Sequence, residues 1–140
     1  MSKFRFQYPI AVRYGDLDPQ WHVNNSKFLT YIETARLHYL LELGLFDGSS
    51  FNNLPLIVGD VHVRYLEPIF PTDDVLVSMG VTRIGNKSVV MEYEVTSSDG
   101  QRIFATAETI MVAYDYHKKT SIPVSTGLRK CFSDFEGRTF

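Results

Sequence analysis

The feature that most constrains the fold is one change of hydrophobic period. Apolar residues recur with helical spacing over residues 26–43, whereas most other apolar residues alternate with their neighbours. The helical segment would be about 27 Å long at 1.5 Å per residue. Gly44 is suited to end it. Three side chains are suited to cap its beginning: Asn24, Asn25 and Ser26.

Strands are expected on both sides of this helix. Residues 4–14 alternate, and Pro9 within them marks an edge strand or a bulge. After a turn-rich loop, four further runs alternate: 56–68, 73–85, 88–97 and 101–116. The turns "IGNK" and "SSDG" join the last three runs as hairpins, which indicates antiparallel pairing. A short helix is expected near 126–135.

This order predicts an α+β fold over a single domain, 1–140. A five-stranded antiparallel sheet would wrap around one long central helix, because the helix must bury its apolar side against the sheet. Such a sheet leaves edges exposed, and an apolar edge strand invites a second chain. We therefore expect a homodimer that joins two sheets. The sequence leaves open whether two dimers pair into a tetramer.

Composition excludes several functional classes. The formal charge of −2 and the pI near 6.0 give no broad positive field, so nucleic acid is not expected as a partner. Cys131 is the only cysteine, which rules out an internal disulfide and a cysteine-based metal cluster. No metal site is expected, because the four histidines lack ligand spacing: His22, His38, His62 and His117.

The sequence shows neither a signal-peptide pattern at its beginning nor a run of about 20 apolar residues that would span a membrane. From these two absences we expect a soluble, cytoplasmic protein without a membrane span.

The stretch "YGDLDPQWHVNN", residues 14–25, lies between the first strand and the long helix. Unpaired N–H groups at a helix N-terminus polarise a carbonyl, and Asp16 or Asp18 could attack that carbonyl or deprotonate a water. The ordinary interpretation is a turn at Asp18-Pro19 followed by capping asparagines. The residues alone leave both interpretations open.

A longer stretch, "VRYGDLDPQWHVNNSKFLTYIETAR" at 12–36, closely resembles the signature of the hot-dog fold acyl-CoA thioesterases of the 4-hydroxybenzoyl-CoA thioesterase type. Two later segments resemble the same family, "VRYLEPIFPTDDVLV" at 63–77 and "IPVSTGLRKCF" at 122–132. The resemblance covers essentially the whole chain. It implies a hot-dog fold and hydrolysis of a small or medium acyl-CoA thioester to free acid and thiol, or of the thioester of an acyl-carrier protein.

The resemblance also implies roles for residues of the loop. The catalytic carboxylate of the family falls on Asp18, as general base or nucleophile, and Asp16 would then be structural. The backbone N–H that polarises the thioester carbonyl falls at Asn25. His22 is a candidate to hydrogen-bond the substrate, although anchoring its own loop is the alternative. No cofactor is implied, because coenzyme A is part of the substrate.

One residue departs from the family pattern. Trp21 stands where the family usually has Gly. Because a bulky side chain disfavours positive φ, we expect φ below zero at this position. The loop would then follow a different path, or the indole would narrow the acyl pocket.

Further residues are candidates to bind the substrate. For the acyl group, four side chains would make an aryl slot or a short aliphatic one: Trp21, Phe28, Tyr31 and Val58. For the phosphates of coenzyme A, Lys87 matches a basic hairpin position of the family, with Arg83 as a helper. For each cation alone, a solvated surface charge is the alternative.

Two other functions remain open from the sequence. One is a hot-dog module that binds acyl thioesters without turnover. The other is a hot-dog hydratase or dehydratase, which needs a His–carboxylate pair over the acyl α and β carbons.

Overall fold

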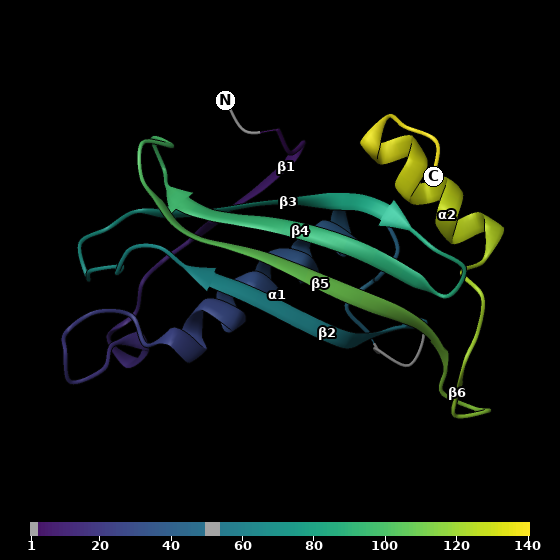
Figure 1. Cartoon of the computed structure of the whole chain (residues 1–140), viewed down its shortest axis with the longest axis horizontal. Coiled ribbons are helices and arrows are strands. Elements are labelled where there is room, and N and C mark those ends of the chain that lie inside the picture. The colour runs from purple at the N-terminus through teal and green to yellow at the C-terminus, as the bar shows by residue number, and fades with distance from the viewer. Residues whose placement is uncertain (1–2, 50–53) are drawn as a thin grey trace.

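The computed structural model describes residues 3–49 and 54–140 (Figure 1). The elements follow in this order: β1 (Phe6–Ile10), the short 3-10 helix η1 (Tyr14–Asp16), α1 (Asn25–Glu42), β2 (Leu56–Tyr65), β3 (Val75–Ile84), β4 (Ser88–Ser97), β5 (Ile103–Asp115), β6 (Thr120–Ser121) and α2 (Thr126–Glu136). The long helix, the four long strands and the closing helix all match the sequence-based expectation within a few residues.

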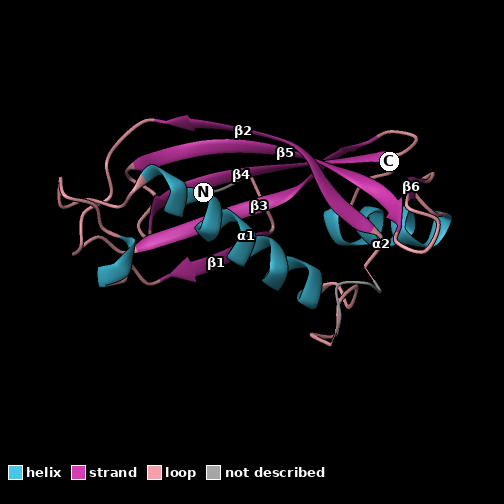
Figure 2. Ribbon diagram, turned by 90° about the horizontal axis from the view of Figure 1, so that it is seen from below, coloured by secondary structure: helices cyan, strands magenta, loops and turns pink. Residues whose placement is uncertain are grey.

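The sheet is antiparallel throughout, with strand order β1-β3-β4-β5-β2. The short β6 pairs with β5 outside this order. Figure 1 shows α1 behind the sheet, and Figure 2 shows α1 along one face of the curved strands. The predicted five-stranded sheet around a central helix is therefore confirmed, with β6 as a small addition.

The core lies between α1 and the inner face of the sheet. Alternate residues of β3 and β4 point toward the helix and are buried: Val75, Val77, Met79, Val81, Val89, Met91, Tyr93 and Val95. The helix contributes its own buried side: Phe28, Tyr31, Ile32, Ala35, Tyr39 and Leu40. At the far end of α1, Phe132 of α2 stacks on Tyr39 with ring centroids 6.3 Å apart.

Both ends of α1 are fixed by local chemistry that the sequence indicates. The Asn24 side chain accepts a hydrogen bond from the Ser26 N–H and caps the N-terminus. At the other end, Gly44 has a φ of +72°, and the Gly44 and Leu45 N–H groups donate to Leu41 and Leu40 carbonyls. This Schellman arrangement confirms Gly44 as the stop signal.

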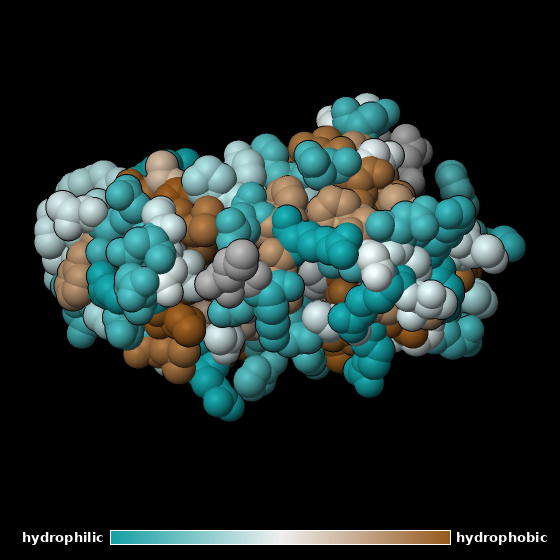
Figure 3. All heavy atoms as spheres, turned by 90° about the horizontal axis from the view of Figure 1, so that it is seen from above, coloured by the Kyte–Doolittle hydropathy of each residue, from teal (hydrophilic) through white to brown (hydrophobic). Residues whose placement is uncertain are grey.

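The two edge strands differ in length. β1 is five residues long and contains Pro9, so the expected strand over 4–14 is too long, and the edge position of Pro9 is confirmed. Residues 14–16 form η1 instead. The opposite edge, β2, is ten residues long. Figure 3 views the molecule from above the orientation of Figure 1, where β1 and α2 lie. This face shows apolar patches among hydrophilic side chains.

Candidate active site

The loop between β1 and α1 is anchored by Asp16. Its side chain is 1% exposed, and its Oδ2 atom accepts hydrogen bonds from the Arg13 N–H at 3.0 Å and from the Tyr31 hydroxyl at 2.7 Å. The Arg13 guanidinium lies 3.6 Å from Oδ1. Burial raises the pKa of Asp16, but the two hydrogen bonds and the Arg13 charge outweigh burial and hold that pKa below its ordinary value. Asp16 is thus an ionised anchor.

Asp18 begins a tight reversal of the chain. The Trp21 N–H donates to the Asp18 carbonyl at 2.9 Å, and the Asp18 N–H donates to the His22 carbonyl at 3.0 Å. The Asp18 side chain is half-buried, and its Oδ1 atom accepts from the Gln20 N–H at 2.9 Å. This Asx turn fixes one carboxylate oxygen.

Trp21 has a φ of +66°, in the left-handed region. The expectation of a negative φ at this position is therefore wrong. The reversal from Asp18 to His22 sets the backbone conformation here, and the loop retains the left-handed backbone that a Gly would adopt. The indole is 57% exposed and packs edge-on against Tyr14, with ring centroids 6.0 Å apart.

The N-terminus of α1 follows directly. The Val23 N–H donates to the Ile69 carbonyl, and the Asn24 N–H donates to the Asp16 carbonyl, so the loop is tied on both sides before the helix begins. Among the residues that the structure describes, the Asn25 N–H has no hydrogen-bond acceptor. A free N–H in the first turn carries part of the positive end of the helix dipole.

These groups meet at one cavity of about 370 Å³. It lies between the loop, the first turn of α1 and the end of β2, and its lining consists of Asp18, Gln20, His22, Val23, Asn25, Phe28, Tyr65, Leu66, Glu67 and Pro68. Of the predicted site residues, the structure brings together Asp18, His22, Asn25 and Phe28. The cavity combines two carboxylates, one imidazole and a helix N-terminus with apolar walls, and the second carboxylate, Glu67, is paired with Arg102 at 3.0 Å.

His22 is held loosely at this cavity. Its Nδ1 atom lies 3.5 Å from the Val23 carbonyl oxygen, and its ring packs edge-on against Phe70 with centroids 6.2 Å apart. The imidazole therefore contacts its own loop and also lines the cavity.

Tyr65 is a cavity residue that the sequence analysis did not identify. Its hydroxyl donates to the Asn25 carbonyl at 3.1 Å, and its ring lies edge-on to Phe28 with centroids 5.1 Å apart. Alternation along β2 places it on the inner face, opposite Ala105 of β5. That alternation is the signal that could have selected it, because it puts an aromatic hydroxyl at the strand end nearest the loop.

Three predicted pocket residues do not line this cavity, and the first of them is Trp21, whose exposed indole packs against Tyr14. Tyr31 is 3% exposed, and its hydroxyl is engaged with Asp16, so it packs beneath the loop. Burial and the Asp16 carboxylate raise the pKa of Tyr31. Val58 lines a separate cavity of about 360 Å³ between α1 and β2, together with Leu40 and Met111.

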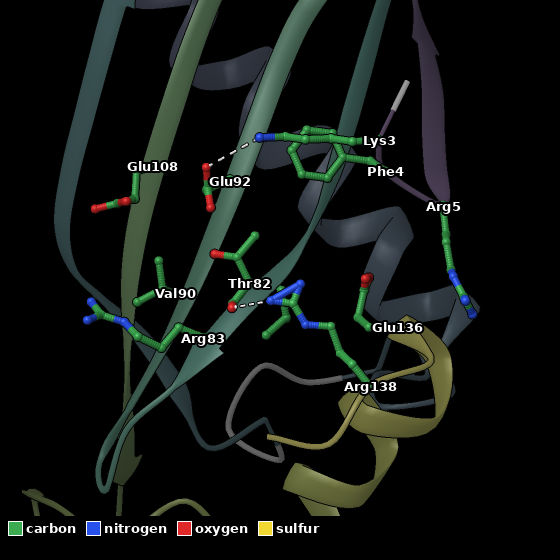
Figure 4. Close-up of a pocket in the computed structure, with 11 residues that line it drawn as sticks. Lys3, Phe4, Arg5, Thr82, Arg83, Val90, Glu92, Glu108, Glu136 and Arg138 are labelled. Carbon is green, nitrogen blue, oxygen red and sulfur yellow. Dashed lines mark hydrogen bonds and ion pairs between the residues drawn. The ribbon is translucent and has the colours of Figure 1, made fainter. Parts of the chain in front are cut away.

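The two predicted phosphate ligands do not line the Asp18 cavity either. Lys87 lies in the β3–β4 hairpin, and its Nζ atom is 3.4 Å from the Ser121 hydroxyl. Arg83 lines a cavity of about 510 Å³ whose residues come from the N-terminal segment, three strands and the C-terminal segment. Figure 4 shows Arg83 there with Lys3, Glu92 and Arg138.

Neither a metal cluster nor a membrane-spanning helix is found in the part of the chain that the structure describes. In that part, no group of three or more His, Cys, Asp or Glu side chains is arranged to hold a metal ion. No helix in residues 3–49 and 54–140 is long and apolar enough to cross a bilayer.

The cavity suits attack on an activated carbonyl. A carbonyl oxygen near the Asn25 N–H would be polarised, and the negative charge that develops on it would be stabilised by the helix N-terminus. The Asp18 carboxylate, which lines the same cavity, could act as base or nucleophile toward the carbonyl carbon.

Comparison with known proteins gives the family. A family model described as the thioesterase-like superfamily matches residues 12–132. The chain belongs to this superfamily. The resemblance drawn from the sequence is thereby confirmed, and membership of the thioesterase-like superfamily places the chain among thioester hydrolases.

Individual relatives agree in length and fold. The long-chain acyl-CoA thioesterase FadM of Escherichia coli (strain K12) is 24% identical over 124 residues, which cover 89% of this chain and 94% of FadM. A thioesterase from Thermus thermophilus, solved with coenzyme A and Zn, is 30% identical with a TM-score of 0.86 and covers 99% of both chains. Slr0204 of Synechocystis, a 1,4-dihydroxy-2-naphthoyl-CoA thioesterase, shares the fold with a TM-score of 0.82 at 18% identity over 94% of this chain and 97% of its own.

Proposed function

We propose that this protein hydrolyses the thioester of a small or medium acyl-CoA to a free acid and a thiol, with Asp18 as general base or nucleophile. The observation that carries the proposal is that Asp18, His22 and the first residue of α1 line one cavity. Membership of the thioesterase-like superfamily supports the reaction class. Acyl-carrier-protein thioesters have the same reacting group and belong to the proposed substrate class.

In this mechanism the Asn25 N–H polarises the thioester carbonyl. Asp18 then follows one of two routes. As a base it removes a proton from a water, whose oxygen bonds to the carbonyl carbon while the C–S bond breaks and the thiolate takes up a proton. As a nucleophile it forms an anhydride with the acyl group and releases the thiol, and water then hydrolyses the anhydride. His22 hydrogen-bonds the substrate in either route.

The walls of the cavity suggest where the acyl group lies. Phe28, Val23 and Leu66 line it with apolar surface. The known thioesterase from Thermus thermophilus was solved with coenzyme A, which supports a coenzyme A thioester here as well. Lys87 and Arg83 do not line the Asp18 cavity. In the expected homodimer, the Lys87 and Arg83 that contact the phosphates would therefore belong to the second protomer.

The decisive test is Asp18→Asn. The amide keeps an oxygen that accepts from the Gln20 N–H but has no basicity, so we expect the turn to survive and kcat for an acyl-CoA to fall at least about 100-fold. Thiol release, followed with a thiol-reactive dye, measures turnover across aryl, short, medium and long acyl-CoA substrates.

Asp99→Asn is the matched control. Asp99 also accepts a backbone N–H two residues on, from Gln101 at 3.0 Å, in the turn between β4 and β5, and it does not line the Asp18 cavity. It should retain wild-type turnover. Parental turnover in the Asp18 variant would contradict the proposal, and retention of intact acyl-CoA by the wild type would identify a binding module instead.

A further inference from the structure

Tyr65 joins β2 to the first turn of α1 across the cavity. Its hydroxyl donates to the Asn25 carbonyl at 3.1 Å, and its ring meets Phe28 one helical turn on. In the part of the chain that the structure describes, no other β2 side chain hydrogen-bonds to α1. Just before the first turn, the Val23 N–H donates to the Ile69 carbonyl and the Asn24 N–H donates to the Asp16 carbonyl, and Phe28 of the first turn is buried in the core.

We propose that Tyr65 is a positioning residue, which holds the first turn of α1, and with it the Asn25 N–H, at a fixed place in the cavity that Asp18 also lines. This inference rests on the proposed function, because it gives the held N–H its role in polarising the thioester carbonyl. Tyr65 acts through Asn25 and not on the reacting atoms.

Because Tyr65 is partly exposed, loss of its hydroxyl should affect turnover more than the stability of the fold. The side chain is 46% exposed, so water competes for its hydrogen bond, and the hydroxyl contributes little to folding. Stabilisation of the negative charge that develops on the carbonyl oxygen is far more sensitive to a displacement of the first turn. It depends on a hydrogen-bond donor whose position is fixed to within a few tenths of an ångström. A small shift of the first turn would therefore reduce turnover without unfolding the protein.

The kinetic test compares Tyr65→Phe with the wild type on a substrate that the wild type hydrolyses. The variant keeps the ring against Phe28 and loses only the hydroxyl. We expect kcat to fall about tenfold while KM stays within about twofold. Tyr116→Phe, the same deletion in the β5–β6 turn, should leave both constants unchanged.

Amide hydrogen exchange provides a readout that does not depend on turnover. Loss of the hydroxyl should increase exchange in a peptide spanning 25–29, because the Asn25 carbonyl loses one of its partners, and should leave the end of α1 near Leu40 unchanged.

The outcomes separate this inference from the proposed function. An inactive wild type would reject the proposed function, and the exchange measurement would still show whether Tyr65 holds the first turn. An active wild type with unchanged kcat in Tyr65→Phe, a raised KM with unchanged kcat, or unchanged exchange over 25–29 would overturn the positioning role.

Discussion

Two aspartates only two positions apart have sharply different surroundings. Asp16 is buried beneath the loop and held by Tyr31 and Arg13, whereas Asp18 has one oxygen in an Asx turn and lines the cavity. The family resemblance separated the two in this way, and the catalytic role that it implies for Asp18 stays a prediction. Spacing alone could not separate them, because both carboxylates precede the helix in the same loop.

The buried, ionised carboxylate of Asp16 predicts that the free energy of unfolding depends on pH. Asp16→Asn should lower the free energy of unfolding by about 2 kcal/mol at pH 7, since it replaces a paired carboxylate in a buried site. The pKa of Asp16 lies below its ordinary 3.8 in the folded state. Its stabilisation is therefore complete above 3.8 and is lost as the pH falls through the lower folded-state value.

Urea unfolding of both proteins from pH 7 down to pH 2 tests this. The difference in free energy should shrink below pH 3.8. Asp47→Asn alters an exposed carboxylate that accepts hydrogen bonds from the Ser49 N–H and hydroxyl, and its free energy of unfolding should differ little from that of the wild type at pH 7. If the difference in the free energy of unfolding between the wild type and Asp16→Asn stays constant down to pH 2, the ionised Asp16 does not stabilise the fold.

Trp21 shows what local propensity could not predict. A tryptophan favours negative φ, yet two hydrogen bonds hold a φ of +66°: the Trp21 N–H donates to the Asp18 carbonyl, and the Asp18 N–H donates to the His22 carbonyl. The chain reversal requires this backbone whatever the side chain, and a propensity rule that considers residue 21 alone cannot include those bonds.

Trp21→Gly should therefore raise stability. Removing the left-handed penalty of a bulky residue is expected to add about 1 kcal/mol to the free energy of unfolding, less the contact with Tyr14. Lys119→Gly is the matched variant, because Lys119 has a φ of +55° in another turn. If Trp21→Gly unfolds at lower urea than the wild type while Lys119→Gly does not, the indole stabilises the loop more than its backbone conformation costs.

At the scale of elements, periodicity located the long segments and missed the short ones. The change from period two to 3.6 identified α1, and alternation with turn chemistry identified the hairpins of β3, β4 and β5. η1 and β6 are too short to show a period. The alternation could not predict the strand order either. It predicts the face of the sheet on which a side chain lies, but not which strand lies next to it. Lys87, with Arg83 as a helper, was named for the phosphates of coenzyme A from the family resemblance, and neither residue lines the Asp18 cavity.

Tyr65 illustrates the same limit at the site. Alternation places it on the inner face of β2, but its contact with Asn25 depends on how far α1 extends along the sheet. That distance is set by the loop and by packing in the core, which no local pattern contains.

At the scale of the whole molecule, the two edges of the sheet are unequal. β1 is short and contains Pro9, whereas β2 is long and, among the described residues, pairs with β5 alone. β2 also exposes Val58 and Val61, at 43% and 39%. A long edge with exposed apolar side chains favours pairing with a second copy. The expected homodimer would therefore form at β2.

Val61→Glu should weaken such a dimer by about tenfold or more, because it buries a charge at the joined edge. Sedimentation equilibrium over a range of protein concentrations measures the dissociation constant. Ile103→Glu is the control, since Ile103 is 40% exposed but lies one strand in from that edge, on β5, where it pairs with Thr96 of β4. A monomer at all concentrations, or equal weakening by both variants, would place the interface elsewhere.

The left-handed turn leaves the only tryptophan of the chain three positions after Asp18, with its indole 57% exposed. Light emitted by the unlabelled protein after excitation near 295 nm therefore originates from this loop alone. The wavelength and intensity of this emission report on the loop that carries Asp18, without any dye or added probe.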